Sequence, residues 1–226
     1  MIPLWAAAAE GPLSISVGGG SSAVKLFLLL TALSFATAAL ISITSFTRIV
    51  IVLSFLRQAL GTPQLPPNQV VIALSLALTA FVMAPTFSKV NADSLGPYLE
   101  DRISGEEALD RGSAPVLQFL LRQTRPEDLR LFYEISNRAR PTRADEVPLT
   151  IAVPAFMISE LTTAFRMGLF IFIPLLMIDL MVSAVLMSLG MMMVPPTLVS
   201  LPLKIGVFLL ADGWHLLVQS LVRSFS

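Results

Sequence analysis

Long stretches without charge dominate this chain, and two of them lie close together in its first half. Leu26–Thr47 holds 22 consecutive uncharged residues, and Val70–Ser88 holds 19. A helix needs about 20 mostly apolar residues to cross the hydrocarbon core of a membrane, so each stretch predicts a membrane-type helix. Gly61–Asn68 contains three prolines, which predict a turn because proline lacks the amide hydrogen that a helix requires. The pattern therefore predicts a helical hairpin.

Two arginines follow the first uncharged stretch. They are Arg48 and Arg57, and no helix breaker appears before Leu60, so one unbroken helix of roughly 50 Å is expected from Leu26 at 1.5 Å per residue. Both arginines lie near the turn of the hairpin. Because basic residues favour the cytoplasmic side of a membrane, the turn is predicted to be cytoplasmic. The polar segment after the second stretch then lies outside the cytoplasm.

That polar segment has the pattern of a small helical domain. Residues 89–146 carry 20 of the 30 Asp, Glu, Lys and Arg side chains of the chain. Apolar residues recur there at helical spacing, which favours two or three short amphipathic helices over a solvated loop. These residues are Val116, Leu117, Leu120, Leu121, Leu129, Phe132 and Tyr133. We expect a packed extracytoplasmic domain.

A second apolar region runs from Val147 to Phe225 and is expected to be interrupted by its prolines. Pro195 and Pro196 are adjacent and cannot continue a helix, so they predict the turn of a second hairpin. The fold class is therefore predicted as all-α, with membrane-associated helical hairpins and a small extracytoplasmic helical domain between them. The parts are 1–22 (N-terminal stub and linker), 23–88 (first hairpin), 89–146 (polar domain) and 147–226 (second hairpin).

The N-terminal stub allows two interpretations. The small residues Ala6–Ala9 are typical of the cleavage end of a secretory signal peptide, but the charged start is missing and the apolar core is short. The stub is either a signal peptide shortened by a late start or a disordered tail, and we slightly favour the former. Gly18–Ser22 is expected to be a flexible linker in both cases.

Composition excludes several functional classes. Hydrophobic residues make up 55% of the chain and charged residues 13%, which argues against an ordinary water-soluble domain. The net charge is zero, so no nucleic-acid partner is expected. The chain has no cysteine and one histidine, His215, and it shows no nucleophile elbow, phosphate-binding loop or zinc motif. We predict no metal, no cofactor and no enzyme activity. An intramembrane aspartyl protease using Asp179 and Asp212 is a weak alternative, because the sequence patterns of that class are absent.

Isolated charges in the second apolar region are the first functional candidates, since a charge inside a membrane normally faces a partner or a water-filled cavity. Asp179 and Lys204 lie at similar depths on either side of the predicted turn, so a salt bridge is expected, within one chain or between neighbours. Such a pair either has a functional role or only fixes packing. Glu160 and Arg166 are six residues apart and lie on different faces of a helix, so each needs another partner. A proton relay through Glu160, Asp179 and Asp212 has no regular spacing to support it.

Methionine is concentrated near the second turn. Six of the ten methionines lie between Met177 and Met193, and Met191, Met192 and Met193 are consecutive. The thioether side chain is flexible and adapts to changing shapes. In a ring of subunits, such turns would close a pore and part around a moving polypeptide. The alternative, methionine as a filler of gaps in an apolar core, suits Met177 and Met181 better than the triplet.

Several motifs in order resemble the FliP family of flagellar export-gate proteins, which is related to the SctR-type subunit of virulence secretion systems. The motifs cover nearly the whole chain. They are Thr44–Leu53, Leu56–Thr62, Pro66–Val70, Ile158–Leu161, Ile178–Leu180, Gly190–Met193, Ser200–Lys204 and Asp212–Trp214. The chain departs from the family at its beginning, where the family usually has a full signal peptide.

The resemblance implies a core subunit of the flagellar type III export gate in the bacterial inner membrane. Copies of it and two smaller membrane subunits would form a gated conduit for unfolded flagellar proteins, beside larger export-apparatus proteins. It implies a pore gasket at Met191, Met192 and Met193, charged intersubunit positions at Glu160, Asp179 and Lys204, and outer-domain association through Phe119 and Phe132. It also implies helices that wind into a cone raised largely out of the bilayer. A stand-alone transporter or ion channel using buried carboxylates is the alternative.

Overall fold

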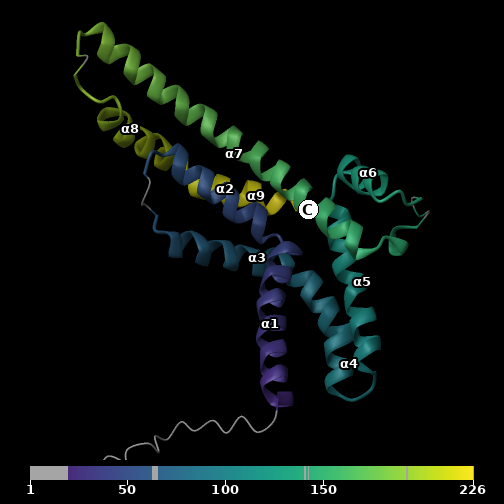
Figure 1. The fold of residues 1–226 in the computed structure, drawn as a ribbon. Coiled ribbons are helices and arrows are strands. Elements are labelled where there is room, and N and C mark those ends of the chain that lie inside the picture. Colours follow the sequence, from purple (N-terminus) through teal and green to yellow (C-terminus); the bar gives the residue numbers. More distant parts are fainter. Residues whose placement is uncertain (1–19, 63–65, 140, 142, 192, 226) are drawn as a thin grey trace, which may run out of the picture. The chain divides into compact units, whose positions relative to one another are not determined.

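The computed structural model describes residues 20–62, 66–139, 141, 143–191 and 193–225. Within these residues the chain is all-helical, which confirms the predicted fold class (Figure 1). The elements are α1 (Gly20–Ser42), α2 (Phe46–Ala59), α3 (Asn68–Val90), a π-helical segment (Asn91–Leu95), α4 (Gly96–Leu99), α5 (Gly105–Gln123), α6 (Pro126–Ile135), a short 3-10 turn (Ala144–Glu146), α7 (Leu149–Ser188), α8 (Thr197–Leu210) and α9 (Gly213–Arg223). The chain divides into two compact units, one up to Leu40 and the other from Ile41 onward.

The first helix begins earlier and ends sooner than expected. Gly20–Ser22 were predicted as part of a flexible linker but belong to α1, and residues 1–19 lie outside the described residues. The unbroken helix predicted from Leu26 to Leu60 is wrong, because α1 ends at Ser42 and α2 begins at Phe46. Hydroxyl side chains explain the break, since they offer the backbone alternatives to helical hydrogen bonds. The Thr44 hydroxyl accepts a hydrogen bond from the Phe46 amide at 3.4 Å, and the Thr47 hydroxyl donates to the Ile41 carbonyl at 3.3 Å.

The core of the second unit lies between α2 and α7. Buried side chains of α2, among them Val52 and Leu56, pack with Ala164 of α7, Val71 of α3 and Leu217 of α9. Figure 1 shows α2 with α7 on one side and α3 on the other. The two central helices approach closely at Gly168, where an added Cβ would lie 2.6 Å from the Phe55 ring. This contact requires glycine.

Prolines interrupt the helices less than the sequence suggested. Helix α7 runs for 40 residues through Pro154 and Pro174, and α3 continues through Pro85. The expectation that prolines break the second apolar region is therefore wrong for Pro154, Pro174 and Pro202, the last of which lies inside α8. A proline removes only one backbone donor, and in apolar surroundings the rest of the backbone has no better partner than its own helix.

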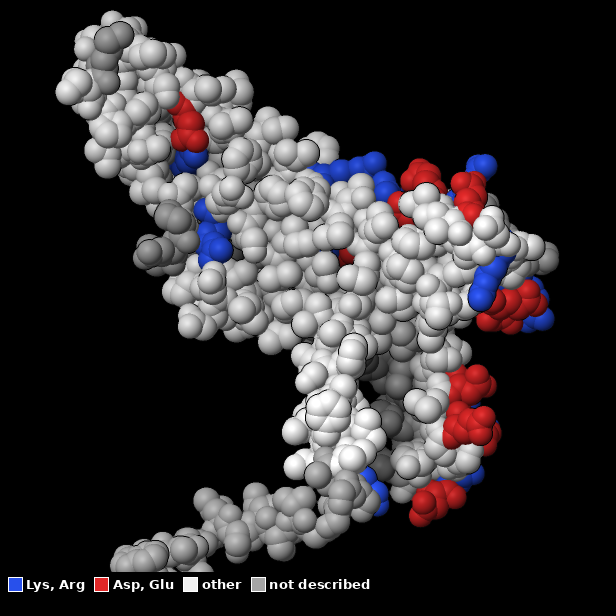
Figure 2. Space-filling model, in the orientation of Figure 1, with Lys and Arg blue, Asp and Glu red and all other residues white. Residues whose placement is uncertain are grey.

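The polar segment forms the short amphipathic helices that its pattern predicted. Ser104 caps α5 by accepting a hydrogen bond from the Glu107 amide at 3.2 Å, and Pro126 begins α6. Leu120 and Tyr133 point inward and pack with Phe156 of α7. Figure 2 shows acidic and basic side chains gathered over this part of the molecule and few elsewhere on the face in view.

Three helical stretches of the described chain are long and apolar enough to cross a membrane. They are Val24–Ser42, Asn68–Leu99 and Leu149–Ser188. Helices α8 and α9 meet the same criterion together, but the chain bends by 64° between them. Asp212 has a left-handed backbone at the bend, with φ of 51°. An added Cβ at Gly213 would lie 2.3 Å from the Phe208 ring, so a larger residue here would displace that ring.

Candidate functional site

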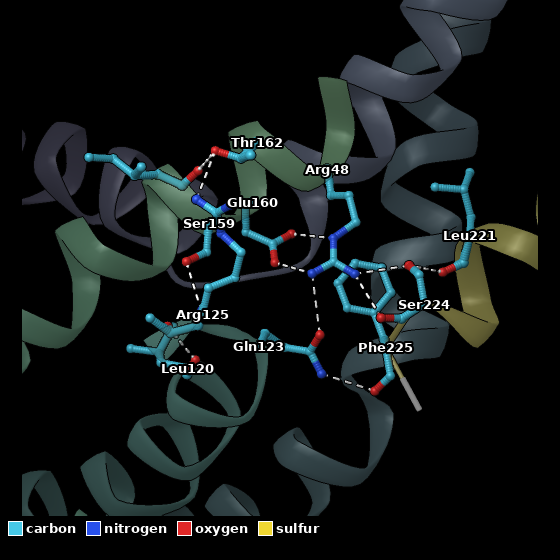
Figure 3. Close-up of polar contacts among 12 residues, drawn as sticks. Arg48, Leu120, Gln123, Arg125, Ser159, Glu160, Thr162, Leu221, Ser224 and Phe225 are labelled. Atoms are coloured by element: carbon cyan, nitrogen blue, oxygen red, sulfur yellow. Dashed lines mark hydrogen bonds and ion pairs between the residues drawn. The ribbon is translucent and has the colours of Figure 1, made fainter. Parts of the chain in front are cut away.

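A buried ion pair joins the two apolar regions. Arg48 of α2 donates from Nε to Glu160 Oε2 of α7 at 2.9 Å, and its Nη2 contacts Glu160 Oε1. The two side chains are 2% and 0% exposed. Two parallel hydrogen bonds between a guanidinium and a carboxylate fix both distance and orientation. Figure 3 shows the pair at the centre of a set of polar contacts.

The same guanidinium holds the residues after α9. Arg48 Nη1 donates to the Ser224 carbonyl at 2.8 Å and to the Ser224 hydroxyl at 2.9 Å. Arg48 Nη2 donates to Gln123 Oε1 at 3.2 Å, and Gln123 Nε2 donates to the Phe225 carbonyl at 3.0 Å. The Phe225 ring lies 3.9 Å from Arg48 Cζ, a cation–π contact. We call Arg48, Gln123, Glu160, Ser224 and Phe225 the Arg48 cluster.

From the sequence alone, Arg48 had only a topological role. The six-residue spacing of Glu160 and Arg166 correctly excluded a pair between them and required another partner for Glu160, without identifying that partner. The sequence did contain evidence for this pair, because Arg48 is a lone cation early in one apolar helix and Glu160 is a lone anion in another. The structure brings the two together across 112 residues of sequence.

A second group of polar contacts holds the start of α6 against α7. Arg125 donates from Nε and Nη2 to the two carboxylate oxygens of Asp128, each at 2.8 Å. The Ser159 hydroxyl donates to Asp128 Oδ2 at 2.5 Å and accepts from the Arg125 amide at 3.0 Å. Burial alone would raise the pKa of Asp128, but these hydrogen bonds favour the ionised form and hold the pKa below its usual value.

The lowered pKa predicts acid sensitivity of this contact. Asp128 adds stability above its unfolded pKa of about 3.9, and this contribution is lost as pH falls through the lower folded pKa. Asp128→Asn should therefore lower stability by about 2 kcal/mol at neutral pH, the range for hydrogen bonds to a charged group. Thermal unfolding of both proteins in detergent, followed by circular dichroism, measures the difference. It should shrink as pH falls below about 4, and a difference that is constant with pH would contradict the assignment.

Asp179 and Lys204 contact each other within one chain. Lys204 Nζ of α8 touches Asp179 Oδ2 of α7 and also donates to the Ala59 carbonyl, at the end of α2, at 2.9 Å. The salt bridge expected from their similar depth is therefore present in the chain itself. Lys204 is 6% exposed and Asp179 is 32% exposed. Their role between neighbouring copies stays a prediction.

The two aromatic candidates lie on different outer helices. Phe119 of α5 is 9% exposed, and its ring centroid lies 5.8 Å from that of Phe156 in α7. Phe132 of α6 is half-buried and packs at the edge of the same cluster. Both side chains therefore contribute to packing within the chain.

The methionine candidates lie at the turn between α7 and α8. Met191 is 44% exposed and Met193 is 95% exposed, whereas Met192 lies outside the described residues. Gly190 precedes them with a φ of 74°, a left-handed conformation that favours glycine. Exposed apolar side chains at a turn do not fill gaps in the core of this chain, so they are available to another surface.

The charged candidates do not form one site. Glu160 bonds to Arg48 and Asp179 to Lys204, in separate parts of the helices. Asp212 lies at the bend between α8 and α9. In the part of the chain that the structure describes, no three His, Asp or Glu side chains gather as metal ligands. The arrangement gives Glu160 and Asp179 structural partners and does not favour a relay through the three carboxylates.

Comparison with known proteins assigns the chain to a family. The model of the FliP family matches residues 29–221. The chain belongs to the FliP family. It is 53% identical over 205 residues to the flagellar biosynthetic protein FliP of Bacillus subtilis, covering 91% of this chain and 93% of the relative. It is 52% identical over 210 residues to the protein of the same name from Pectobacterium carotovorum, covering 92% and 81%.

A third relative shows the same agreement. The flagellar biosynthetic protein FliP of Aquifex aeolicus is 48% identical over 218 residues, which cover 95% of this chain and 91% of the relative. The matched range of the FliP family includes the Arg48–Glu160 pair, the Asp179–Lys204 pair and the methionine turn. These three features therefore lie within the family region, whereas Ser224 and Phe225 of the Arg48 cluster follow it.

Proposed function

We propose that this chain is a component of the flagellar protein export apparatus and a core subunit of its gate. Copies of the chain and two smaller membrane subunits form a gated conduit for unfolded flagellar proteins, next to larger export-apparatus proteins. The observation that carries the proposal is the family match over residues 29–221, with relatives named flagellar biosynthetic proteins. The function requires no bond-making chemistry.

The geometry of α7 supports an arrangement beyond a simple membrane span. At 1.5 Å per residue its 40 residues are about 60 Å long, twice the hydrocarbon core of about 30 Å. Large apolar side chains such as Phe165, Phe170 and Met181 are exposed along it. A long helix with an uncovered apolar surface suits an assembly in which neighbouring helices cover it, partly outside the bilayer.

The methionine turn is the gate in this proposal. Met191, Met192 and Met193 from several copies meet on a common axis and close the conduit to ions. Constrictions lined by apolar side chains block ions by excluding water. The flexible thioether side chains then separate when a polypeptide passes. The 95% exposure of Met193 supports this role, because its side chain has almost no packing against the residues that the structure describes.

The remaining candidates hold the assembly together. Phe119 and Phe132 belong to the outer helical domain, which associates with its neighbours outside the cytoplasm. Glu160, Asp179 and Lys204 position the helices that meet neighbouring copies in the inner membrane of the flagellar basal body. Their contacts within the chain support this role indirectly, since each fixes a helix that carries exposed apolar side chains.

Cysteine cross-linking tests the common axis. The chain has no native cysteine, so Met193→Cys introduces one thiol at the turn. In the assembled complex, oxidation should join copies into covalent dimers, because a disulfide requires Cα atoms about 4.4–6.8 Å apart. Leu210→Cys is a matched control, since Leu210 is also an exposed apolar residue, at 90%. Cross-linking no stronger at 193 than at 210 would reject the common axis.

A further inference from the structure

Two isolated charges of the second apolar region, Arg166 and Asp212, take no part in the contacts described above. Both side chains are exposed, and neither forms an ion pair with any residue that the structure describes. Asp212 stands at the start of α9, but its side chain accepts no capping hydrogen bond there. Because an isolated charge in an apolar helix normally faces a partner or water, each of the two is free to meet another chain.

One carboxylate of the same chain lies near Arg166 but already has other partners. Arg166 is close enough to Asp128 to favour the ionised form of that carboxylate. The two oxygens of Asp128 are nevertheless bonded to Arg125 and Ser159. The described part of the chain therefore supplies no carboxylate that pairs with Arg166.

Each of the two charges stands at the end of an exposed apolar stripe. On α7, Phe170 and Ile173 follow Arg166 by four and seven residues, so the three side chains share one face of the helix. On α8, Leu203, Val207 and Leu210 have the same spacing and lead to Asp212. All five apolar side chains are exposed. We call these two faces the α7 stripe and the α8 stripe.

The two stripes lie at the same level of the molecule. Phe170 of α7 and Val207 of α8 line one apolar groove, which has a volume of about 480 Å³. Ala211 and Gly213, on either side of Asp212, line it too. Both helices run from this groove to the methionine turn (Figure 1). Each stripe therefore carries its charge at the end away from that turn, and the charge is basic on α7 and acidic on α8.

We propose that the α8 stripe of one copy packs against the α7 stripe of the next copy, with Asp212 of the first paired to Arg166 of the second. Opposite charges at matching ends favour this contact, whereas two α7 stripes or two α8 stripes would bring like charges together. A contact between two different faces is head-to-tail and can close into a ring. The inference rests on the proposed function for the assembly of copies, and it specifies which faces meet.

Cross-linking between two differently tagged copies tests the contact. One copy carries Arg166→Cys and the other Asp212→Cys, and both are expressed with the complete export apparatus. Because the chain has no native cysteine, a short bis-maleimide should join the two tags. Two copies that both carry Arg166→Cys, or both Asp212→Cys, should react more weakly, since a head-to-tail contact does not bring identical positions together.

Charge reversal gives a second measurement. Arg166→Glu or Asp212→Arg alone should lower the amount of assembled complex about tenfold, because like charges would then meet. The double variant Arg166→Glu with Asp212→Arg restores opposite charges and should recover most of the complex. The control Arg223→Glu reverses another exposed cation of the same region and should leave assembly unchanged. If Asp212→Arg does not fold, the cysteine pair decides.

Several outcomes would overturn the contact. They are a double variant that folds but recovers no complex, equal cross-linking of identical positions, and cross-linking of Arg166→Cys only to a smaller membrane subunit. Met193→Cys separates this inference from the proposed function. If copies join at 193 but not between 166 and 212, they assemble through other faces, and only this inference fails. If copies join at neither place, the proposed gate fails as well.

Discussion

Glu160→Ala should destabilise the second unit by about 3–5 kcal/mol, the cost of removing one partner from a buried ion pair. Arg48 would keep its charge in a site where its side chain is 2% exposed, with no carboxylate to balance it. Ser224 and Gln123 would still accept hydrogen bonds, but neither carries a charge. Thermal or denaturant unfolding of the purified chain in detergent, followed by circular dichroism, measures the loss.

Two controls separate the ion pair from general damage. Glu134→Ala removes an exposed carboxylate that pairs with Arg130 and should cost less than about 1 kcal/mol. The double variant Arg48→Met with Glu160→Leu removes both charges and should recover much of the loss, because an apolar pair needs no desolvation of charge. If Glu160→Ala unfolds like the unaltered chain yet fails to assemble, the residue acts between subunits and not in this cluster.

Changing Met191, Met192 and Met193 to glycine should make the membrane leak small ions in cells that assemble the export gate. In the proposed gate, these apolar side chains exclude water from the closed conduit, and glycine would remove them. Some export should remain, since the substrate path is widened and not blocked. The fall in membrane potential, reported by a voltage-sensitive dye, measures the leak.

A control with the same chemistry is available in α7. Met177 and Met181 are 50% and 61% exposed, and changing both to alanine removes two thioethers away from the turn. The membranes of cells that carry this double variant should not leak ions. Tight membranes in the triplet variant, with normal amounts of the assembled gate, would remove the gasket from the proposed mechanism.

Local patterns predicted the helices better than their ends. Whether a segment forms a helix or a turn depends mainly on nearby residues. The hairpin turn at Pro195 and the amphipathic helices of the polar segment could therefore be predicted from the sequence. The break before Phe46 depends on hydroxyl contacts from Thr44 and Thr47. The continuity of α7 through Pro174 depends on surroundings that hydropathy alone does not describe.

A contact between residues far apart in the sequence was predicted only where the two residues lie on either side of one turn. Asp179 and Lys204 flank such a turn at similar distances, so an antiparallel hairpin brings them together. Arg48 and Glu160 lie in different hairpins, and their contact depends on how α2 packs against α7. The phenylalanine positions came from the family resemblance alone, because phenylalanine is common throughout such a chain. The methionine triplet was first singled out by its clustering at the predicted turn.

Lys204 determines where the methionine-bearing hairpin is anchored. Its ammonium group contacts the carboxylate of α7 and the last carbonyl of α2, so three helices are pinned at one atom. Beyond this anchor the hairpin projects for about ten residues on the α7 side, a lever of about 15 Å at 1.5 Å per residue. Force from a passing polypeptide at the tip would bend the end of the hairpin about the fixed contact at Lys204. The core around α2 would then keep its packing through each cycle of opening.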